Sequence, residues 1–203
     1  MVTRLQIYAN MKERRYIMAR TIRQLHDREM ADMAILYADP RSSFGHRDAE
    51  ERYDITESTF RTALEHAAIE HKVSDQVFQR MEEKALYNVR EKIGQEAEHR
   101  VRLHYAELRR RREAFTVPEK KALWLVIKYS ESPCDKAQFC REIALDTKFF
   151  DRVVMSVILT DKIADETFEM LRKKGLKNNW SRNTMDFWDK ISKERKSRLG
   201  RDE

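Results

Sequence analysis

Residues 55 to 88 read ITESTFRTALEHAAIEHKVSDQVFQRMEEKALYN, and a related stretch follows 90 residues later, where residues 145 to 178 read LDTKFFDRVVMSVILTDKIADETFEMLRKKGLKN. Aligned without a gap, the two stretches share seven identical residues in 34 positions, whereas background residue frequencies predict about two. The identical pairs are Phe60/Phe150, Lys72/Lys162, Asp75/Asp165, Phe78/Phe168, Lys84/Lys174, Leu86/Leu176 and Asn88/Asn178. The sequence therefore predicts one helical unit that the chain uses twice.

The composition predicts an all-α fold. Only four glycines and three prolines occur in 203 residues, of which 37 % are charged and 41 % are apolar. Helix-favouring residues therefore dominate the chain. There is no run of 18 apolar residues, so we expect no membrane-spanning segment. Two cysteines are too few for a disulfide scaffold, and we expect a protein of the reducing cytoplasm.

We expect three parts along the chain. Residues 1–90 form an N-terminal helical domain with the first copy of the unit, and residues 118–203 form a C-terminal helical domain with the second copy and a basic tail. Residues 91–117 form a linking helix that ends in a run of arginines. Because Gly94 is the only glycine and no proline occurs between Gln76 and Val117, this region is either one long central helix or two helices that break near Gly94.

Each copy is predicted to contain a short helix, a turn and a longer helix. The packing positions of the second copy hold Phe139, Cys140, Ile143, Ala144, Leu145, Phe150 and Val153. Those of the first copy hold Ala49, Glu50, Tyr53, Asp54, Ile55, Phe60 and Ala63, where Glu50 occupies a position at which a small residue is usual. The pattern resembles the helix-turn-helix class in general, over about 20 residues in each copy. A generic packed helical repeat gives similar spacing and is the alternative interpretation.

The resemblance implies that the second helix of each motif presents its early residues to the major groove of DNA. Basic and hydroxyl side chains in or near the motifs can then contact bases or phosphates. The predicted nucleic-acid-binding residues are Arg41, Ser42, Ser43, His46, Arg47, Thr56, Ser58, Arg61, Thr62, Arg109, Arg110, Lys148 and Arg152. We favour the first copy as the reader, because the loop before its motif adds Arg41 and the following His46 and Arg47. The carboxylates that oppose phosphate contacts are Glu57, Asp146 and Asp151.

The residue patterns of catalytic and metal sites are absent from the sequence. The pairs His66/His71 and His99/His104 are each five residues apart, a spacing that does not place two ligands on one helix face. There is no P-loop, Rossmann glycine pattern or HExxH motif. We therefore expect no enzyme activity, no metal ion and no cofactor.

A formal charge of +6 and a pI near 9.3 favour a polyanionic partner. The leading hypothesis is a protein that binds double-stranded DNA, sequence-specifically or structurally, as a transcription regulator or an accessory factor of a mobile element. The alternative is a helical protein-interaction protein, an inhibitor or adaptor that acts on a nucleic-acid-processing enzyme. RNA is a weaker hypothesis, because the aromatic-rich strands of common RNA-binding modules are missing.

The two main hypotheses predict different surfaces. DNA binding predicts one continuous basic face that includes Arg41 and Arg61. Protein binding predicts a surface of mixed character with an exposed apolar patch.

Overall fold

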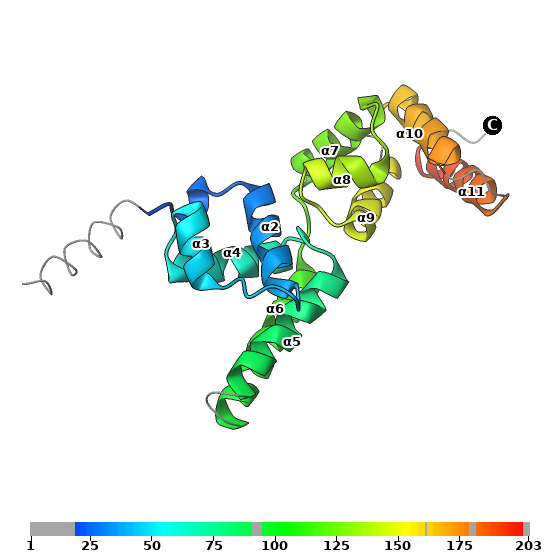
Figure 1. Cartoon of the computed structure of the whole chain (residues 1–203). Helices are drawn as coiled ribbons and strands as arrows, with labels where there is room; N and C mark the ends of the chain where they lie inside the picture. The colour runs from blue at the N-terminus through cyan, green and yellow to red at the C-terminus, as the bar shows by residue number, and fades with distance from the viewer. Residues whose placement is uncertain (1–18, 91–94, 161, 179–181, 201–203) are drawn as a thin grey trace, which may run out of the picture. The chain divides into compact units, whose positions relative to one another are not determined.

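The computed structural model describes residues 19–90, 95–160, 162–178 and 182–200. In these ranges the predicted all-α fold is confirmed, since the regular structure is helical apart from one isolated bridge between Arg20 and Ile55. The chain divides into two compact units (Figure 1), which we call unit 1 (Met1–Phe115) and unit 2 (Thr116–Glu203). We describe each unit by itself.

Unit 1 is built around α4, which other helices of the unit cover on several sides. Its elements are η1 (Ile22–Gln24), α2 (Asp27–Ala38), α3 (His46–Tyr53), α4 (Glu57–Ile69), α5 (Asp75–Arg90) and α6 (Gln95–Ala114). Helices α2, α3 and α6 all pack on α4, and α2 also packs on α5. The apolar residues Phe60, Ala63 and Ala67 recur at helical spacing on α4 and are buried, so this face of α4 forms the centre of the core.

Unit 2 repeats this order of helices. Its elements are α7 (Glu119–Glu131), α8 (Lys136–Glu142), α9 (Thr147–Ile158), α10 (Asp165–Asn178) and α11 (Arg182–Arg198). Helix α7 packs on α9 and α10, α8 packs on α9, and α11 packs on α10. Phe150 is fully buried at the position that aligns with Phe60. Cys140, which stands at a predicted packing position, is also buried, and so is Trp188 of α11.

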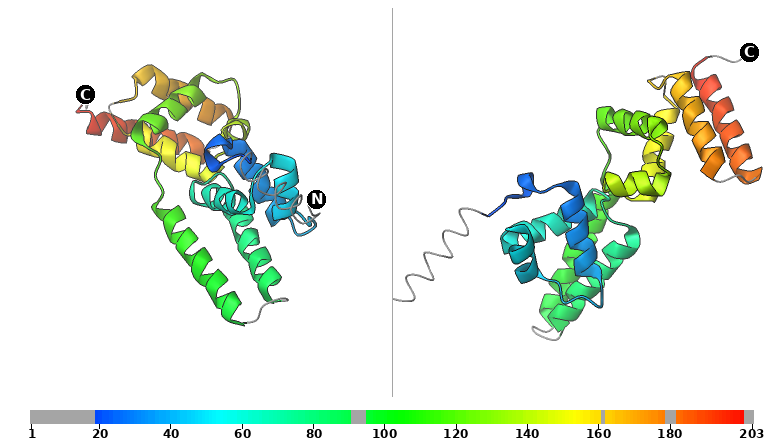
Figure 2. Two further views of the ribbon diagram at one scale, coloured as in Figure 1. Left: turned by 90° about the vertical axis from the view of Figure 1, so that its left-hand side faces the viewer. Right: turned by 45° about the horizontal axis from the view of Figure 1, so that its top comes forward.

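The region predicted as a central helix is a helical hairpin. Helices α5 and α6 lie side by side and antiparallel (Figure 2), with Arg109 of α6 paired to Glu82 of α5 at 2.7 Å. The interpretation as one long helix is therefore wrong, and the alternative with two helices is correct. Residues 91–94 lie outside the described ranges. Helix α6 belongs to unit 1, which extends to Phe115.

A buried arginine holds the turn between two helices in each unit. Arg112 donates hydrogen bonds to the carbonyls of Ala68 and Val73 and pairs with Asp75 at 2.9 Å. These carbonyls lack a donor within a helix, because Ala68 lies in the last turn of α4 and Val73 lies in the loop that follows it. Arg112 also lies over the ring of Phe78, 5.6 Å from its centroid.

Arg195 makes the corresponding contacts in unit 2. It donates to the carbonyls of Ile158 and Ile163 and pairs with Asp165 at 3.3 Å. It also lies 5.4 Å from the ring centroid of Phe168. All of these partners are 90 residues after their counterparts in unit 1.

Candidate nucleic-acid interface

Both units contain a short helix, a tight turn and a longer helix. The first turn is possible because Asp54 adopts a left-handed conformation with φ of 52°, and Thr56 then caps α4 by accepting a hydrogen bond from the backbone N–H of Thr59. In unit 2, Ala144 has φ of 49° and Asp146 caps α9. Helices α3–α4 and α8–α9 thus have the connection that a helix-turn-helix needs.

The outward row of α4 carries hydroxyl groups and no unpaired cation. Ser58 and Thr62 stand one turn apart, and the Thr62 hydroxyl donates to the Ser58 carbonyl at 3.0 Å. Arg61 is exposed beside this row, but its guanidinium pairs with Glu57 on the same helix. Glu65 adds a further carboxylate, at 3.6 Å from His104.

The outward row of α9 is more basic. Lys148 and Arg152 stand at the positions that align with Ser58 and Thr62, and both are exposed. Among the described residues Lys148 has no ion pair, while Arg152 lies over the ring of Phe149 at 4.9 Å. The exposed carboxylate of Asp151 next to them is paired with Lys136 of α8 at 2.8 Å. The opposing charge predicted for this helix is therefore partly neutralised.

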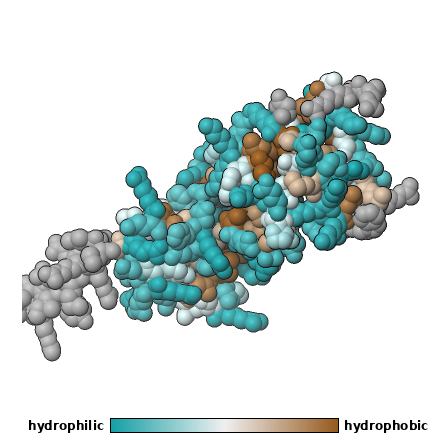
Figure 3. All heavy atoms as spheres, turned by 90° about the horizontal axis from the view of Figure 1, so that it is seen from above, coloured by the Kyte–Doolittle hydropathy of each residue, from teal (hydrophilic) through white to brown (hydrophobic). Residues whose placement is uncertain are grey.

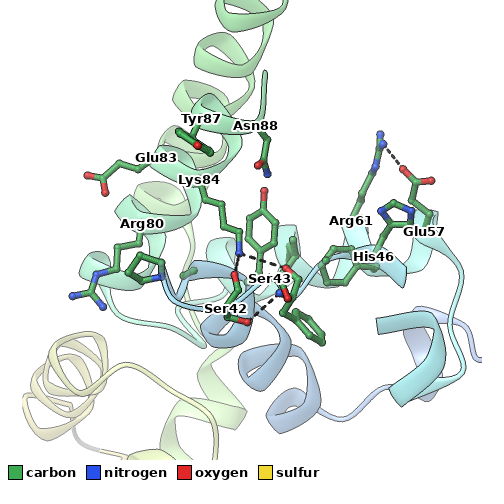
Figure 4. Close-up of a pocket in the computed structure, with 17 residues that line it drawn as sticks. Ser42, Ser43, His46, Glu57, Arg61, Arg80, Glu83, Lys84, Tyr87 and Asn88 are labelled. Atoms are coloured by element: carbon green, nitrogen blue, oxygen red, sulfur yellow. Dashed lines mark hydrogen bonds and ion pairs between the residues drawn. The ribbon is translucent and has the colours of Figure 1, made fainter. Parts of the chain in front are cut away.

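A hollow of about 940 Å³ opens in unit 1 beside the motif. We call it the unit 1 hollow, and Figure 4 shows the side chains around it. The structure brings several of the predicted residues together here, although they come from the loop before α3, from α3 and from α4. They are Ser42, Ser43, His46 and Arg61, and helix α5 adds Arg80, Lys84, Tyr87 and Asn88.

Several predicted contact residues already have structural roles. Thr56 is the cap of α4, and the carbonyl of Ser42 accepts a hydrogen bond from Lys84 at 2.8 Å. Arg109 is paired with Glu82 on the α5–α6 hairpin, and Arg110 is paired with Glu107 of its own helix. The hairpin arginines do not line the unit 1 hollow, while Arg41 and Arg47 are exposed near it.

Residues of α5 that shape the unit 1 hollow were not among those predicted from the sequence. Lys84 lines the unit 1 hollow and lies 5.1 Å from the ring centroid of Tyr37. Burial raises the pKa of Tyr37, and a hydrogen bond with Asn88 opposes this rise. Lys84 and Asn88 are identical in both copies, and this identity was the sequence signal that could have indicated them. Their partners, however, are more than forty residues away in the chain.

The described residues show neither a metal site nor a membrane span. In those ranges, no three His, Cys, Asp or Glu side chains come together as metal ligands would. Every helix there falls short of the length or the apolar character needed to cross a bilayer. Comparisons with protein-family models, with curated proteins and with solved structures give no match.

Proposed function

We propose that this protein binds double-stranded DNA and that α9 of unit 2 is the helix that enters the major groove. The observation that carries the proposal is the outward row of α9, where Lys148 and Arg152 are exposed one helical turn apart. Residues four apart project from the same face of a helix, so both cations can reach one DNA groove.

The carboxylate of Asp151, next to Arg152, opposes this assignment less than the sequence suggests. Asp151 would repel phosphates if it were alone, but Lys136 lies 2.8 Å from it and compensates its charge. On α4, by contrast, Arg61 is already paired with Glu57, and Glu65 adds a negative charge. The charges therefore favour α9 as the helix that contacts DNA, whereas the sequence alone favoured the first copy, which contains α4.

Fluorescence anisotropy with labelled genomic fragments tests the proposal. We expect binding that weakens steeply as salt rises, because lysine and arginine contacts release counterions from the phosphates. The double variant Lys148→Ala/Arg152→Ala should reduce the affinity about tenfold or more. Failure of the wild-type chain to bind any duplex at low salt would refute the proposal.

A second candidate function rests on exposed apolar side chains. The face in Figure 3 is mainly hydrophilic with separate hydrophobic patches, which is a mixed surface. Trp124 is 53 % exposed on α7, and Leu103 is 57 % exposed on α6. Exposed apolar side chains can contact a protein partner, as in an inhibitor or adaptor of a nucleic-acid-processing enzyme. Co-purification after nuclease treatment separates the two functions, because a partner held only through DNA is lost.

If the DNA proposal holds, the biological role would be that of a transcription regulator or of an accessory factor of a mobile element. Chromatin immunoprecipitation from the native cells would distinguish these roles. Peaks at promoters would support a regulator, and peaks confined to the ends of a mobile element would support an accessory factor.

A further inference from the structure

Lys84 of unit 1 and Lys174 of unit 2 occupy aligned positions but differ in how many of their donors are used. The ammonium of Lys174 donates to the carbonyl of Tyr129 and to both oxygens of Ser132. Lys84 donates to two carbonyls only, at 2.8 Å and 3.5 Å. Since an ammonium has three donors, Lys84 keeps one that has no acceptor among the described residues, and Lys84 lines the unit 1 hollow.

The opposite wall of the unit 1 hollow also carries groups that attract anions. His46 from α3 and Arg61 from α4 lie across the hollow from Lys84 (Figure 4). Tyr87 of α5 is 60 % exposed and places an aromatic ring at the edge of the hollow. A hollow of this size, with apolar walls and a few polar groups that converge, is typical of small-molecule sites.

The aligned region of unit 2 lacks these features. Lys136 and Asp151 stand where unit 1 has His46 and Arg61, and they pair with each other. The hollow there is smaller, about 500 Å³, and the aromatic residues Phe187 and Trp188 of α11 line it. An anion site is therefore a property of unit 1 alone.

Carboxylates near the unit 1 hollow do not cancel its attraction for anions. Glu57 binds Arg61 in an exposed ion pair, which is weak and can exchange for a phosphate. Glu83 and Arg80 lie at the rim, outside the space between Lys84 and Arg61 (Figure 4). Burial lowers the pKa of Lys84 despite the opposing effect of Asp39 and Asp48, so its ammonium lacks full compensation.

We propose that the unit 1 hollow binds a nucleotide, with the phosphate between Lys84, Arg61 and His46 and the base against Tyr87. A phosphate accepts hydrogen bonds from lysine, arginine and histidine side chains, and an aromatic ring stacks on a base without selecting its sequence. The proposal concerns unit 1, so it does not depend on DNA binding by α9.

Isothermal titration calorimetry of the full chain tests the proposal with adenosine 5′-monophosphate, inorganic phosphate and adenosine. We expect the nucleotide to bind at least about tenfold more tightly than either part alone, because both ends of the site are then occupied. Arg61→Gln should weaken nucleotide binding about tenfold. The control Arg111→Gln, at an exposed position of α6, and the variant Lys148→Ala/Arg152→Ala should leave it unchanged.

Three outcomes of the titration would contradict the proposal, and a further titration with a DNA duplex identifies the source of the nucleotide. No heat with the nucleotide, equal affinity for phosphate and nucleotide, or an unchanged affinity of Arg61→Gln would each contradict it. Nucleotide binding that a saturating DNA duplex abolishes would support the site and identify DNA as the source of its phosphate. Nucleotide binding that persists beside the duplex would support a free nucleotide as the ligand.

Discussion

Units 1 and 2 each contain a buried arginine with aligned partners, but they differ on their surfaces. The buried arginines Arg112 and Arg195 bind aligned carbonyls and aligned aspartates. The outward rows of α4 and α9 differ at aligned positions, since Ser58 and Thr62 face solvent in one unit and Lys148 and Arg152 in the other. Packing constrains internal positions, whereas exposed positions are free to change with the ligand. The two units should therefore have similar stability and different binding partners.

The largest expected effect is the loss of a buried arginine. Arg112→Met and Arg195→Met should each destabilise their own unit by about 3–5 kcal/mol, because buried carbonyls and a carboxylate lose their donor. All three tryptophans of the chain lie in unit 2. In a urea titration, tryptophan fluorescence therefore follows unit 2, while circular dichroism follows both units.

Two exposed substitutions provide the control for this comparison. Arg111→Met and Lys196→Met lie next to the buried arginines in sequence and should change stability by no more than about 0.5 kcal/mol. A stable Arg112→Met variant beside an unstable Arg195→Met variant would show that the two arginines are not equivalent.

A smaller effect should follow from a change at Gly175, which lies inside α10. A Cβ atom at this position would approach the indole of Trp188 to 2.5 Å. Gly175→Ala should therefore destabilise unit 2 by about 1–3 kcal/mol despite the better helix propensity of alanine. The measurement is the urea midpoint by tryptophan fluorescence.

Unit 1 suggests how to reverse that effect. Ala85 aligns with Gly175, and Tyr105 packs on Phe78 as Trp188 packs on Phe168. Trp188→Tyr should therefore restore stability when it is combined with Gly175→Ala. Because Trp188 is then absent, circular dichroism provides the readout. If the double variant does not recover stability, Tyr105 of α6 and Trp188 of α11 do not have equivalent roles.

The outward rows should differ in their contribution to DNA binding. Lys148→Ala/Arg152→Ala should lower the slope of log affinity against log salt by about two and weaken binding about tenfold or more, because two phosphate or base contacts are lost. The matched variant Ser58→Ala/Thr62→Ala removes hydroxyl groups only and should weaken binding less than about threefold. Anisotropy across a salt series measures both quantities. Equal losses in the two variants would remove the distinction between α4 and α9.

The smallest effect should come from adding the charges of α9 to α4. Ser58→Lys/Thr62→Arg should strengthen low-salt DNA binding by a few-fold, on the order of one added phosphate contact, because Glu57 and Glu65 oppose part of the new charge. The same anisotropy assay detects this change. Weaker binding than in the wild type would indicate that α4 contacts DNA through its hydroxyl groups.

Much of the local structure followed from the sequence. The short helix, turn and longer helix expected in each copy correspond to α3–α4 and α8–α9, because capping residues and apolar spacing act within a few residues of one another. Helix propensity alone could not separate one long helix from a hairpin between Gln76 and Val117, since both have the same residues in helical conformation. The contact of Arg109 with Glu82 decides between them.

The candidate site was predictable only in part. Arg61 and His46 were chosen from their places in the motif, and they do line the unit 1 hollow. Lys84 was missed because its partners lie in the loop before α3, about forty residues earlier. The sequence could not show that Glu57 pairs with Arg61, or that Lys136 compensates Asp151, because each pairing depends on side-chain direction or on a second helix.

By itself, the sequence determined the all-α class, the pair of related stretches and the apolar faces that pack, since these depend on residue type and short-range periodicity. The tertiary structure alone decided which cations remain available at the surface. Arg112 and Arg195 are buried by contacts with residues more than thirty positions away. Lys148 is exposed, although its helix α9 is no more basic in sequence than α6 and α11, which carry the two arginines. Charge is a property of a residue, but its availability to a ligand depends on which partners the fold places beside it.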